Sequence, residues 1–268
     1  MTLLFAKLAV SIGVVLGLSW LAERAGPRVA GVLSGYPLGT AMLLYFIGIE
    51  QGVAFASESA IYSMPGLIAT LAFMYAYFQM SRRICDKPVV LQIILSSGAA
   101  FAAFVAVSWI CQHFDFTLIT AALTLFVAMM VAIVLFRGIE NAVILRRVRL
   151  TKRVVVFRAA TAAFIVLAIS GAAALIGPRW AGLFSGFPVT LYPMILIIHF
   201  SYGAEPVHTL IRNFPRGMGA LLVYIVAVTL SYPVIGIGAG TLLAFGVATF
   251  YLVLYTTFVW WRYRGSQA

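Results

Sequence analysis

The stretch GPRVAGVLSGYP at Gly26–Pro37 returns as GPRWAGLFSGFP at Gly177–Pro188, and this repetition decides how the chain is organised. Eight of the twelve positions are identical, and Tyr36 is matched by a second aromatic residue, Phe187. The same offset of 151 residues aligns two further pairs, Lys7 with Arg158 and Trp109 with Trp260. Self-similarity at a fixed offset indicates that one structural unit is present more than once. We therefore expect two copies of one unit.

The composition places this unit in a membrane. Hydrophobic residues make up 63% of the 268 residues and charged residues 9%, against about half and about a quarter in soluble domains. Blocks of about 20 apolar residues, enough for a helix to cross the hydrocarbon core, occur nine times: Leu3–Ala22, Ala30–Ile49, Ala60–Met80, Pro88–Cys111, Thr117–Phe136, Val155–Ile176, Ala181–Phe200, Ile211–Ser231 and Gly238–Trp261. We predict an all-α integral membrane protein with nine transmembrane helices. Only a short turn separates the last two, so ten spans remain an alternative.

Basic residues set the predicted orientation. Between Arg137 and Arg158 the sequence has seven basic residues against one acid, Glu140. Lys and Arg are retained on the cytoplasmic side, so this loop is expected inside, the N-terminus outside and the C-terminus inside. The net charge of +11 gathers at helix ends rather than along one face, which favours this topology over binding to nucleic acid.

Counting spans then relates the two copies to each other. Equivalent helices are five spans apart, an odd number, so the second copy crosses the membrane in the opposite direction. We predict two inverted four-helix repeats, residues 1–112 and 151–268, joined by a linker helix and a basic loop at 113–150. Arg179 is accordingly expected outside, because its counterpart Arg28 is inside.

Each motif predicts a break inside a membrane-spanning helix. Proline lacks an amide donor and glycine tolerates unusual dihedral angles, so helical geometry is expected to break near Gly35–Pro37 and Gly186–Pro188. In each copy the serine would lie near the N-cap of the restarted helix and the proline in its first turn. Such breaks are tolerated in lipid only where the freed backbone groups meet protein or water.

Paired breaks near the midplane of an inverted repeat are a common basis for a transporter's substrate site, and free amides at a helix start attract anions. We therefore predict that the two motifs meet near the middle of the bilayer and line a substrate site. Its residues are Ser34, Gly35, Tyr36, Pro37, Ser185, Gly186, Phe187 and Pro188. The second-tier candidates are Arg28, Arg179, Lys7 and Arg158. The alternative is that both motifs are packing kinks whose small residues let helices approach closely.

The other polar residues form no recognisable site. Three acids and two histidines are expected in loops: Glu50, Glu58, Glu205, His113 and His208. His199 is expected near a helix end, and Cys85 and Cys111 fall on opposite sides of the membrane, so they are not expected to form a disulfide. The sequence has no metal-ligand spacing, no cofactor motif and no nucleophile paired with a base. We expect neither an enzyme nor a bound metal or cofactor.

The order of residues in each half resembles the small four-helix GlpM-like membrane proteins and the related DUF3147 group. The matching positions are Lys7, Arg28, Ala30, Gly31, Pro37, Gly48 and Glu50, with Arg158, Arg179, Ala181, Gly182, Pro188, Gly203 and Glu205 in the second copy. The linker helix is unmatched, so this chain looks like a fused duplicate of a unit that would otherwise need to pair. The resemblance implies a bacterial inner-membrane location and a link to envelope polysaccharide production.

These observations favour a membrane transporter, either a secondary transporter or a flippase for a lipid-linked intermediate. Its partners would be the lipid bilayer and an anionic or polar small-molecule or lipid-linked substrate, and homo-oligomerisation stays open. The alternative is a scaffold of an envelope polysaccharide synthesis complex that transports nothing. A dry interface between the repeats would favour the scaffold.

Overall fold

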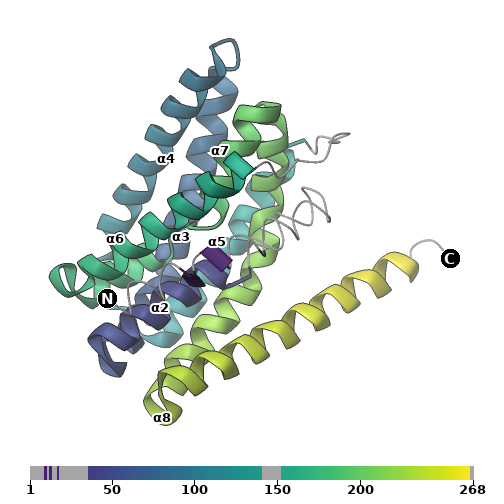
Figure 1. The fold of residues 1–268 in the computed structure, drawn as a ribbon. Coiled ribbons are helices and arrows are strands. Elements are labelled where there is room, and N and C mark those ends of the chain that lie inside the picture. Colours follow the sequence, from purple (N-terminus) through teal and green to yellow (C-terminus); the bar gives the residue numbers. More distant parts are fainter. Residues whose placement is uncertain (1–8, 11, 14–16, 18–35, 141–151, 266–268) are drawn as a thin grey trace.

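The computed structural model describes residues 36–140 and 152–265, together with short pieces at 9–10, 12–13 and 17. These parts of the chain are helical and contain no strand. The helices in chain order are α2 (Leu38–Gln51), α3 (Val53–Arg83), α4 (Val89–Cys111), α5 (Leu118–Leu135), the short 3-10 helix η1 (Phe136–Gly138), α6 (Lys152–Ser185), α7 (Leu191–Tyr202) and α8 (Ala204–Gly265). They form the bundle shown in Figure 1.

The helices are those of a multi-pass membrane protein. Within the described residues, five stretches are long and apolar enough to cross a membrane: Val53–Arg83, Val89–Cys111, Leu118–Gly138, Ala163–Ser185 and Ala204–Thr257. Two apolar helices, α2 and α7, are shorter. Large apolar side chains also cover the outside of the bundle. On α5, for example, Ile119, Val127 and Val134 are each more than half exposed. A surface of this kind matches hydrocarbon rather than water.

Single glycines with positive φ bend the chain between helical segments. Gly52 (φ 89°) separates α2 from α3, and Gly203 (φ 83°) separates α7 from α8. Gly177 (φ 76°) bends α6, and Gly236 (φ 78°) bends α8. Figure 1 shows α8 running down the bundle, reversing at its lower end and leaving the bundle as a second leg. The short turn expected between the last two apolar blocks is confirmed at Gly236, and the gap between the blocks Val155–Ile176 and Ala181–Phe200 contains the bend at Gly177.

These one-residue turns correct several positions predicted as loops. Glu50 lies in α2 and Glu58 in α3. Glu205 lies in the first turn of α8, and His208 also belongs to α8. The loops are absent because a left-handed glycine lets one helix follow another without a connecting segment. Helices α3, α6 and α8 are longer than the apolar blocks that predicted them, whereas α2 and α7 are shorter.

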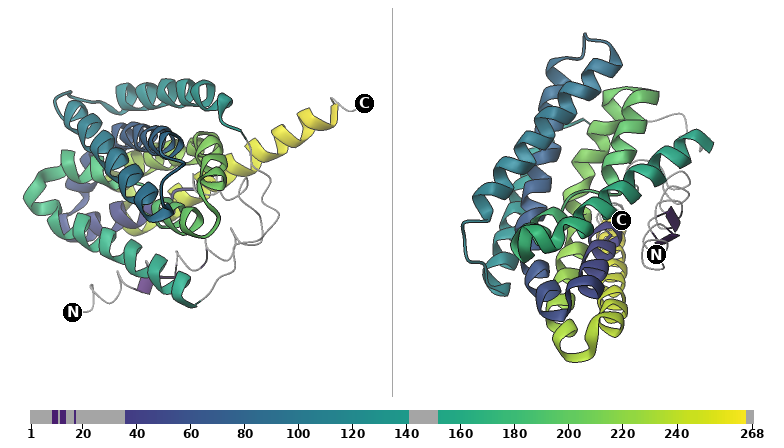
Figure 2. Two further views of the ribbon diagram at one scale, coloured as in Figure 1. Left: turned by 90° about the horizontal axis from the view of Figure 1, so that it is seen from above. Right: turned by 60° about the vertical axis from the view of Figure 1, so that its left-hand side comes forward.

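Helix α3 is the centre of the bundle. It packs against α2, α4, α5, α6 and α8, and the view from above in Figure 2 shows helices on several sides of it. Its buried residues include both large apolar side chains and the small residues Ser59, Ser63 and Gly66. The two ends of α3 therefore serve as references for the rest of the molecule: Ser59 and Tyr62 mark the first, Ser81 and Arg82 the second.

Candidate functional site

The break predicted in the second motif is present. Helix α6 ends at Ser185 and α7 begins at Leu191, so residues 186–190 interrupt the helical path. In the first motif α2 begins at Leu38, directly after Pro37. Ser34 and Gly35 lie outside the described residues, as do Lys7 and Arg28. The first restart thus comes directly after its motif, and the second begins at Leu191, three residues after Pro188.

The two restarts have the same backbone hydrogen bonds. In the first, the N–H of Leu38 donates to the carbonyl of Tyr36 at 2.8 Å, and in the second, the N–H of Val189 donates to that of Phe187 at 2.8 Å. The next pair repeats the match: Ala41 N–H donates to Pro37 O and Tyr192 N–H to Pro188 O, both at 2.8 Å. Every atom pair is related by the offset of 151 residues. The backbones of the two restarts therefore match at these hydrogen bonds.

The two restarts also touch. A Cβ built on Gly39 would lie 3.4 Å from Cβ of Val189 and 3.7 Å from Cγ2 of Thr190. These are van der Waals distances, so the first turn of α2 lies against the start of α7. Gly39 and Thr190 are again 151 residues apart, which means that equivalent positions of the two copies meet each other.

Neither restart is closed by a side chain. The N-cap residues are Pro37 and Thr190, neither makes a side-chain capping bond, and neither helix has an acidic residue in its first turn. The prediction of Ser185 near an N-cap is wrong, because Ser185 is the last residue of α6 and its hydroxyl donates to Gly182 O at 2.7 Å. Pro37 and Pro188 likewise precede the first turn rather than lie in it.

Ser185 and Gly186 face α3 in a very tight contact. The hydroxyls of Ser185 and Ser63 are hydrogen bonded, and Thr70 Oγ1 donates to the carbonyl of Gly186 at 2.6 Å. A Cβ on Gly186 would lie 2.4 Å from the backbone of Gly66, and a Cβ on Gly66 would lie 2.3 Å from the carbonyl of Leu183. Only glycine fits at these positions. This contact holds the end of α6 against α3 and is the packing role that the sequence offered as the alternative.

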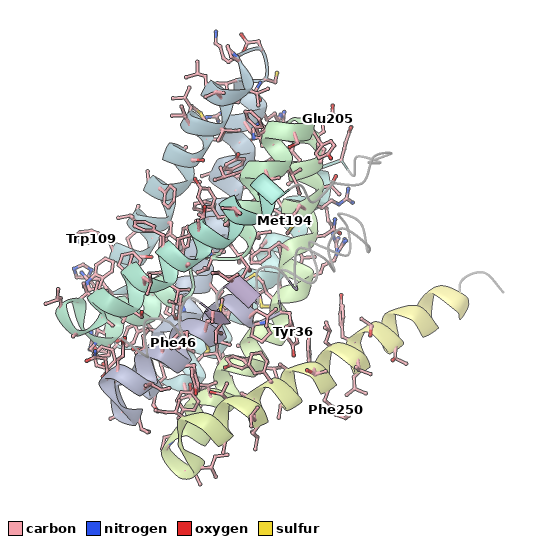
Figure 3. All side chains as sticks on the ribbon, in the orientation of Figure 1. Tyr36, Phe46, Trp109, Met194, Glu205 and Phe250 are labelled. Atoms are coloured by element: carbon pink, nitrogen blue, oxygen red, sulfur yellow. The ribbon has the colours of Figure 1, made fainter. Side chains whose placement is uncertain are left out.

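The two aromatic residues of the motifs have different surroundings. Phe187 is buried in an aromatic cluster with Phe73, Phe101, Phe104 and Tyr192, at ring-centroid distances of 5.3–6.0 Å. Tyr36 stacks on Phe245 at 6.0 Å, and its hydroxyl is 2.7 Å from Oγ1 of Thr249 on the second leg of α8. Figure 3 shows Tyr36 on the side of α2 that faces this leg. One motif thus offers a polar group and the other an apolar ring.

The second-tier arginine that can be placed lies far from the restarts. Arg179 Nη2 donates to Asp115 Oδ1, and its guanidinium lies over the ring of Tyr62, 5.3 Å from the centroid. This group is at the first end of α3. Arg158 lies in α6, with a side chain outside the described part of the structure. Arg179 is therefore not part of a site at the restarts.

A buried polar network that sequence reasoning missed lies at the second end of α3. His199 on α7 connects Tyr77 on α3 with Gln92 on α4, and Ser81 on α3 bonds His208 on α8. Its members come from four helices far apart in the sequence. The available signal was a histidine and a glutamine inside apolar blocks, because polar side chains at membrane depth are rare without a role.

No family model, curated protein or solved structure matches the chain. Among the residues that the structure describes, His, Cys, Asp and Glu form no group of three able to hold a metal ion. The geometry offers instead two uncapped helix starts in contact, a glycine-lined contact beside them, and one buried histidine network.

Proposed function

We propose that this protein is a membrane transporter, either a secondary transporter or a flippase for a lipid-linked intermediate, with its substrate site where the two restarts meet. The observation that carries the proposal is the contact of Gly39 with Val189 and Thr190, which joins two interrupted helices at equivalent positions. Paired interrupted helices are a recurring basis for transporter sites. The matching hydrogen bonds at both restarts support a common origin of the two halves.

An inverted arrangement of two four-helix repeats, residues 1–112 and 151–268, fits the directions of α2 and α7. Helix α2 leads through Gly52 to the first end of α3. Helix α7 leads through Gly203 to the start of α8, where His208 bonds Ser81 near the second end of α3. Equivalent half-helices therefore run to opposite ends of the bundle. This is the relation expected for inverted rather than parallel repeats.

The nine-span topology is part of the same proposal. Bends at Gly177 and Gly236 divide α6 and α8 into the segments that the count of nine requires. The charged groups also separate as proposed: Arg179 pairs with Asp115 at the first end, while Arg212 bonds the carbonyl of Ile139, after the linker helix, at the second. We place the second end in the cytoplasm, with the N-terminus outside and the C-terminus inside.

An anionic or strongly hydrogen-bonding head group is the ligand that the restarts favour. A helix start carries partial positive charge, about half an elementary charge, from its unpaired amides. Here two such starts lie together with no side-chain cap and no acidic residue in either first turn. An anion between them would stabilise both ends at once. With the resemblance to envelope-linked proteins, a polar or lipid-linked envelope precursor in the bacterial inner membrane is the substrate class proposed.

A scaffold that transports nothing is the second candidate, and one observation favours it. Ser185 and Gly186 are sealed against Ser63 and Gly66, leaving no room for a ligand on that side of the break. If the other side is equally filled, the breaks would only shape the interface. The two candidates differ in whether solute crosses the membrane.

Reconstitution with a matched pair of glycine variants tests the proposal. Purified protein in proteoliposomes is assayed for uptake of labelled anionic and lipid-linked envelope precursors. Gly39→Val places two methyl groups between the restarts, whereas Gly246→Val adds them where nothing lies within 4 Å. We expect Gly39→Val to lower transport at least about tenfold, equivalent to about 1.4 kcal/mol, and Gly246→Val to leave it unchanged. Equal rates in both variants, or no transport by the parent protein, would reject a site at the restarts.

A further inference from the structure

The histidine network joins the two halves at the second end of α3. The hydroxyl of Tyr77 is 2.8 Å from Nδ1 of His199, and Nε2 of the same ring is 3.1 Å from Oε1 of Gln92. The amide nitrogen of Gln92 donates to the carbonyls of Cys85 at 3.0 Å and Lys87 at 2.8 Å. The side chain of His199 has no exposed surface. A continuous chain of hydrogen bonds therefore leads from α3 through α7 to the α3–α4 turn.

This chain determines where the protons are. Because the Gln92 nitrogen must face two carbonyls, its oxygen faces His199 and can only accept. Nε2 of His199 therefore carries a hydrogen. In the neutral ring Nδ1 accepts from the hydroxyl of Tyr77, and both ring nitrogens are then paired.

A second proton on His199 would disrupt the network. Nδ1 would become a donor, so the Tyr77 hydroxyl would have to turn and accept, leaving its own hydrogen without this partner. The facing groups offer no compensation. The ionisable groups nearest to His199 are His208 on α8 and Arg82 on α3, which would repel a second positive charge, and Tyr192 on α7, near Tyr77. Glu205 at the start of α8 is exposed. The ion pairs formed among the described residues, Lys87–Asp86 and Arg179–Asp115, involve neither histidine.

A buried cation without a carboxylate is strongly unfavourable, whereas the same cation is stable in water. The protonated ring therefore favours a conformation in which this end is opened to water, and the neutral ring favours the closed conformation seen here. Histidine is the side chain whose charge changes in the physiological pH range. Opening must separate the helices that the network connects, α3 and α4 from α7.

The network is also confined to one half of the repeat. At the offset of 151 residues, the counterparts of His199, Tyr77 and Gln92 are Gly48, Val228 and Leu243. Gly48 lies under Ile237, whose side chain would be 3.1 Å from an added Cβ. At the position equivalent to His199, the chain therefore packs an apolar side chain over a glycine. The nearest hydrogen bonds there join hydroxyl groups, such as those of Tyr232 and Thr241, and involve no histidine.

We infer that His199 is a proton-binding site that opens the Arg82 end of the molecule when it is protonated. In transport terms, which rest on the proposed function, the coupling ion would be a proton, and its binding would release the closed cytoplasmic end. Acid favours the open state and neutral pH the closed one. Tyr77 and Gln92 are positioning residues that fix the tautomer of the ring.

Ring-¹⁵N-histidine NMR on the full chain in lipid nanodiscs tests the site directly, because the protein has only three histidines. His113→Gln and His208→Gln variants assign the His199 signals by elimination and keep the His199 side chain in place. We expect the Nε2–H tautomer at about pH 8 and a doubly protonated ring at about pH 5, within the range where histidines titrate. A His199 ring that stays neutral over this range, or that holds the other tautomer at high pH, would overturn the inference.

Opening is measured by the distance between spin labels at exposed positions on either side of the network. Asp86→Cys and Glu205→Cys are labelled in a Cys85→Ser, Cys111→Ser background. The distance should increase on acidification in this protein and in its His113→Gln form, and should stay constant in the His199→Gln form, whose amide does not titrate. The same response in the His199→Gln form, or none in the parent, would contradict the coupling. Neither measurement needs transport. If His199 is protonated and the distance increases but no transport is found, only the proposed function is rejected. If the protein transports but His199 is not protonated, only this inference is rejected.

Discussion

The two helix restarts have the same backbone and different surroundings. Both make the same pair of 2.8 Å backbone hydrogen bonds, yet Phe187 is enclosed by aromatic rings, whereas Tyr36 presents a hydroxyl to Thr249. The backbone geometry follows from the Gly-aromatic-Pro sequence that both copies keep. The side chains around it come from different helices and have diverged. The comparison teaches that the same local backbone can be held by different surroundings, and that in the proposed site the polar side-chain chemistry would come from Tyr36.

The largest effect is expected where the two halves are locked together. Gly66→Leu would place a side chain where even a Cβ lies 2.3 Å from the carbonyl of Leu183. Helix α3 and the end of α6 must then separate, which should lower stability by about 3 kcal/mol, the upper part of the range for overpacking. Unfolding in mixed micelles measures this loss. Gly98→Leu is the matched control, since nothing lies within 4 Å of its Cβ position. An equal loss of stability in this variant would show that the effect of Gly66→Leu does not come from the α3–α6 contact.

A smaller effect is expected from making the second restart resemble the first. Phe187→Tyr adds a hydroxyl inside the buried aromatic cluster of Phe73, Phe101, Phe104 and Tyr192. An unpaired buried hydroxyl should lower stability by about 1–3 kcal/mol. The same unfolding assay measures it. Unchanged stability would indicate that a polar partner or water reaches position 187, and that the surroundings of Phe187 are as polar as those of Tyr36.

The smallest effect is expected from the converse change. Tyr36→Phe removes the hydroxyl that bonds Thr249 but keeps the ring on Phe245. Stability should fall by about 1 kcal/mol or less, as for one partly exposed hydrogen bond. If the Tyr36 half supplies the polar chemistry, the apparent KM for transport should rise several-fold while the maximal rate is kept. A fall in maximal rate with constant KM would assign Tyr36 a structural role.

The sequence predicted the features that depend on backbone chemistry. Gly186 and Pro188 both weaken helical geometry, so the break after Ser185 was foreseeable. These residue types alone do not decide it, because Pro65 and Gly66 lie inside α3 without a break. The N-cap was not foreseeable, because the restart begins only at Leu191 and Ser185 bonds back into α6. The sequence also did not predict that Glu205 and His208 lie in a helix. A single glycine with positive φ, Gly203, joins α7 directly to α8 where a loop was expected.

Features that depend on several helices were out of reach of the sequence. The fit of Gly66 against Gly186 and the bond between Tyr77 and His199 join residues about 120 positions apart. Neither residue of such a pair has a local pattern that names its partner. The sequence did allow the inference that a polar residue in an apolar block, such as Gln92, needs a hydrogen-bonding partner. The internal repeat led to the prediction that the two motifs approach each other, whereas the contact found lies one to two residues beyond them, between Gly39 and Val189 with Thr190.

A disulfide across the two restarts tests the central claim most directly. The Cβ positions at Gly39 and Val189 are 3.4 Å apart, close to the roughly 3.5–4.5 Å spanned by a disulfide. In a Cys85→Ser, Cys111→Ser background, Gly39→Cys with Val189→Cys should cross-link on mild oxidation. Transport should stop in the cross-linked protein and return on reduction, because the restarts must move against each other around the substrate. Failure to cross-link would contradict the contact itself, and full transport by the cross-linked protein would contradict the claim that this contact is the transport site.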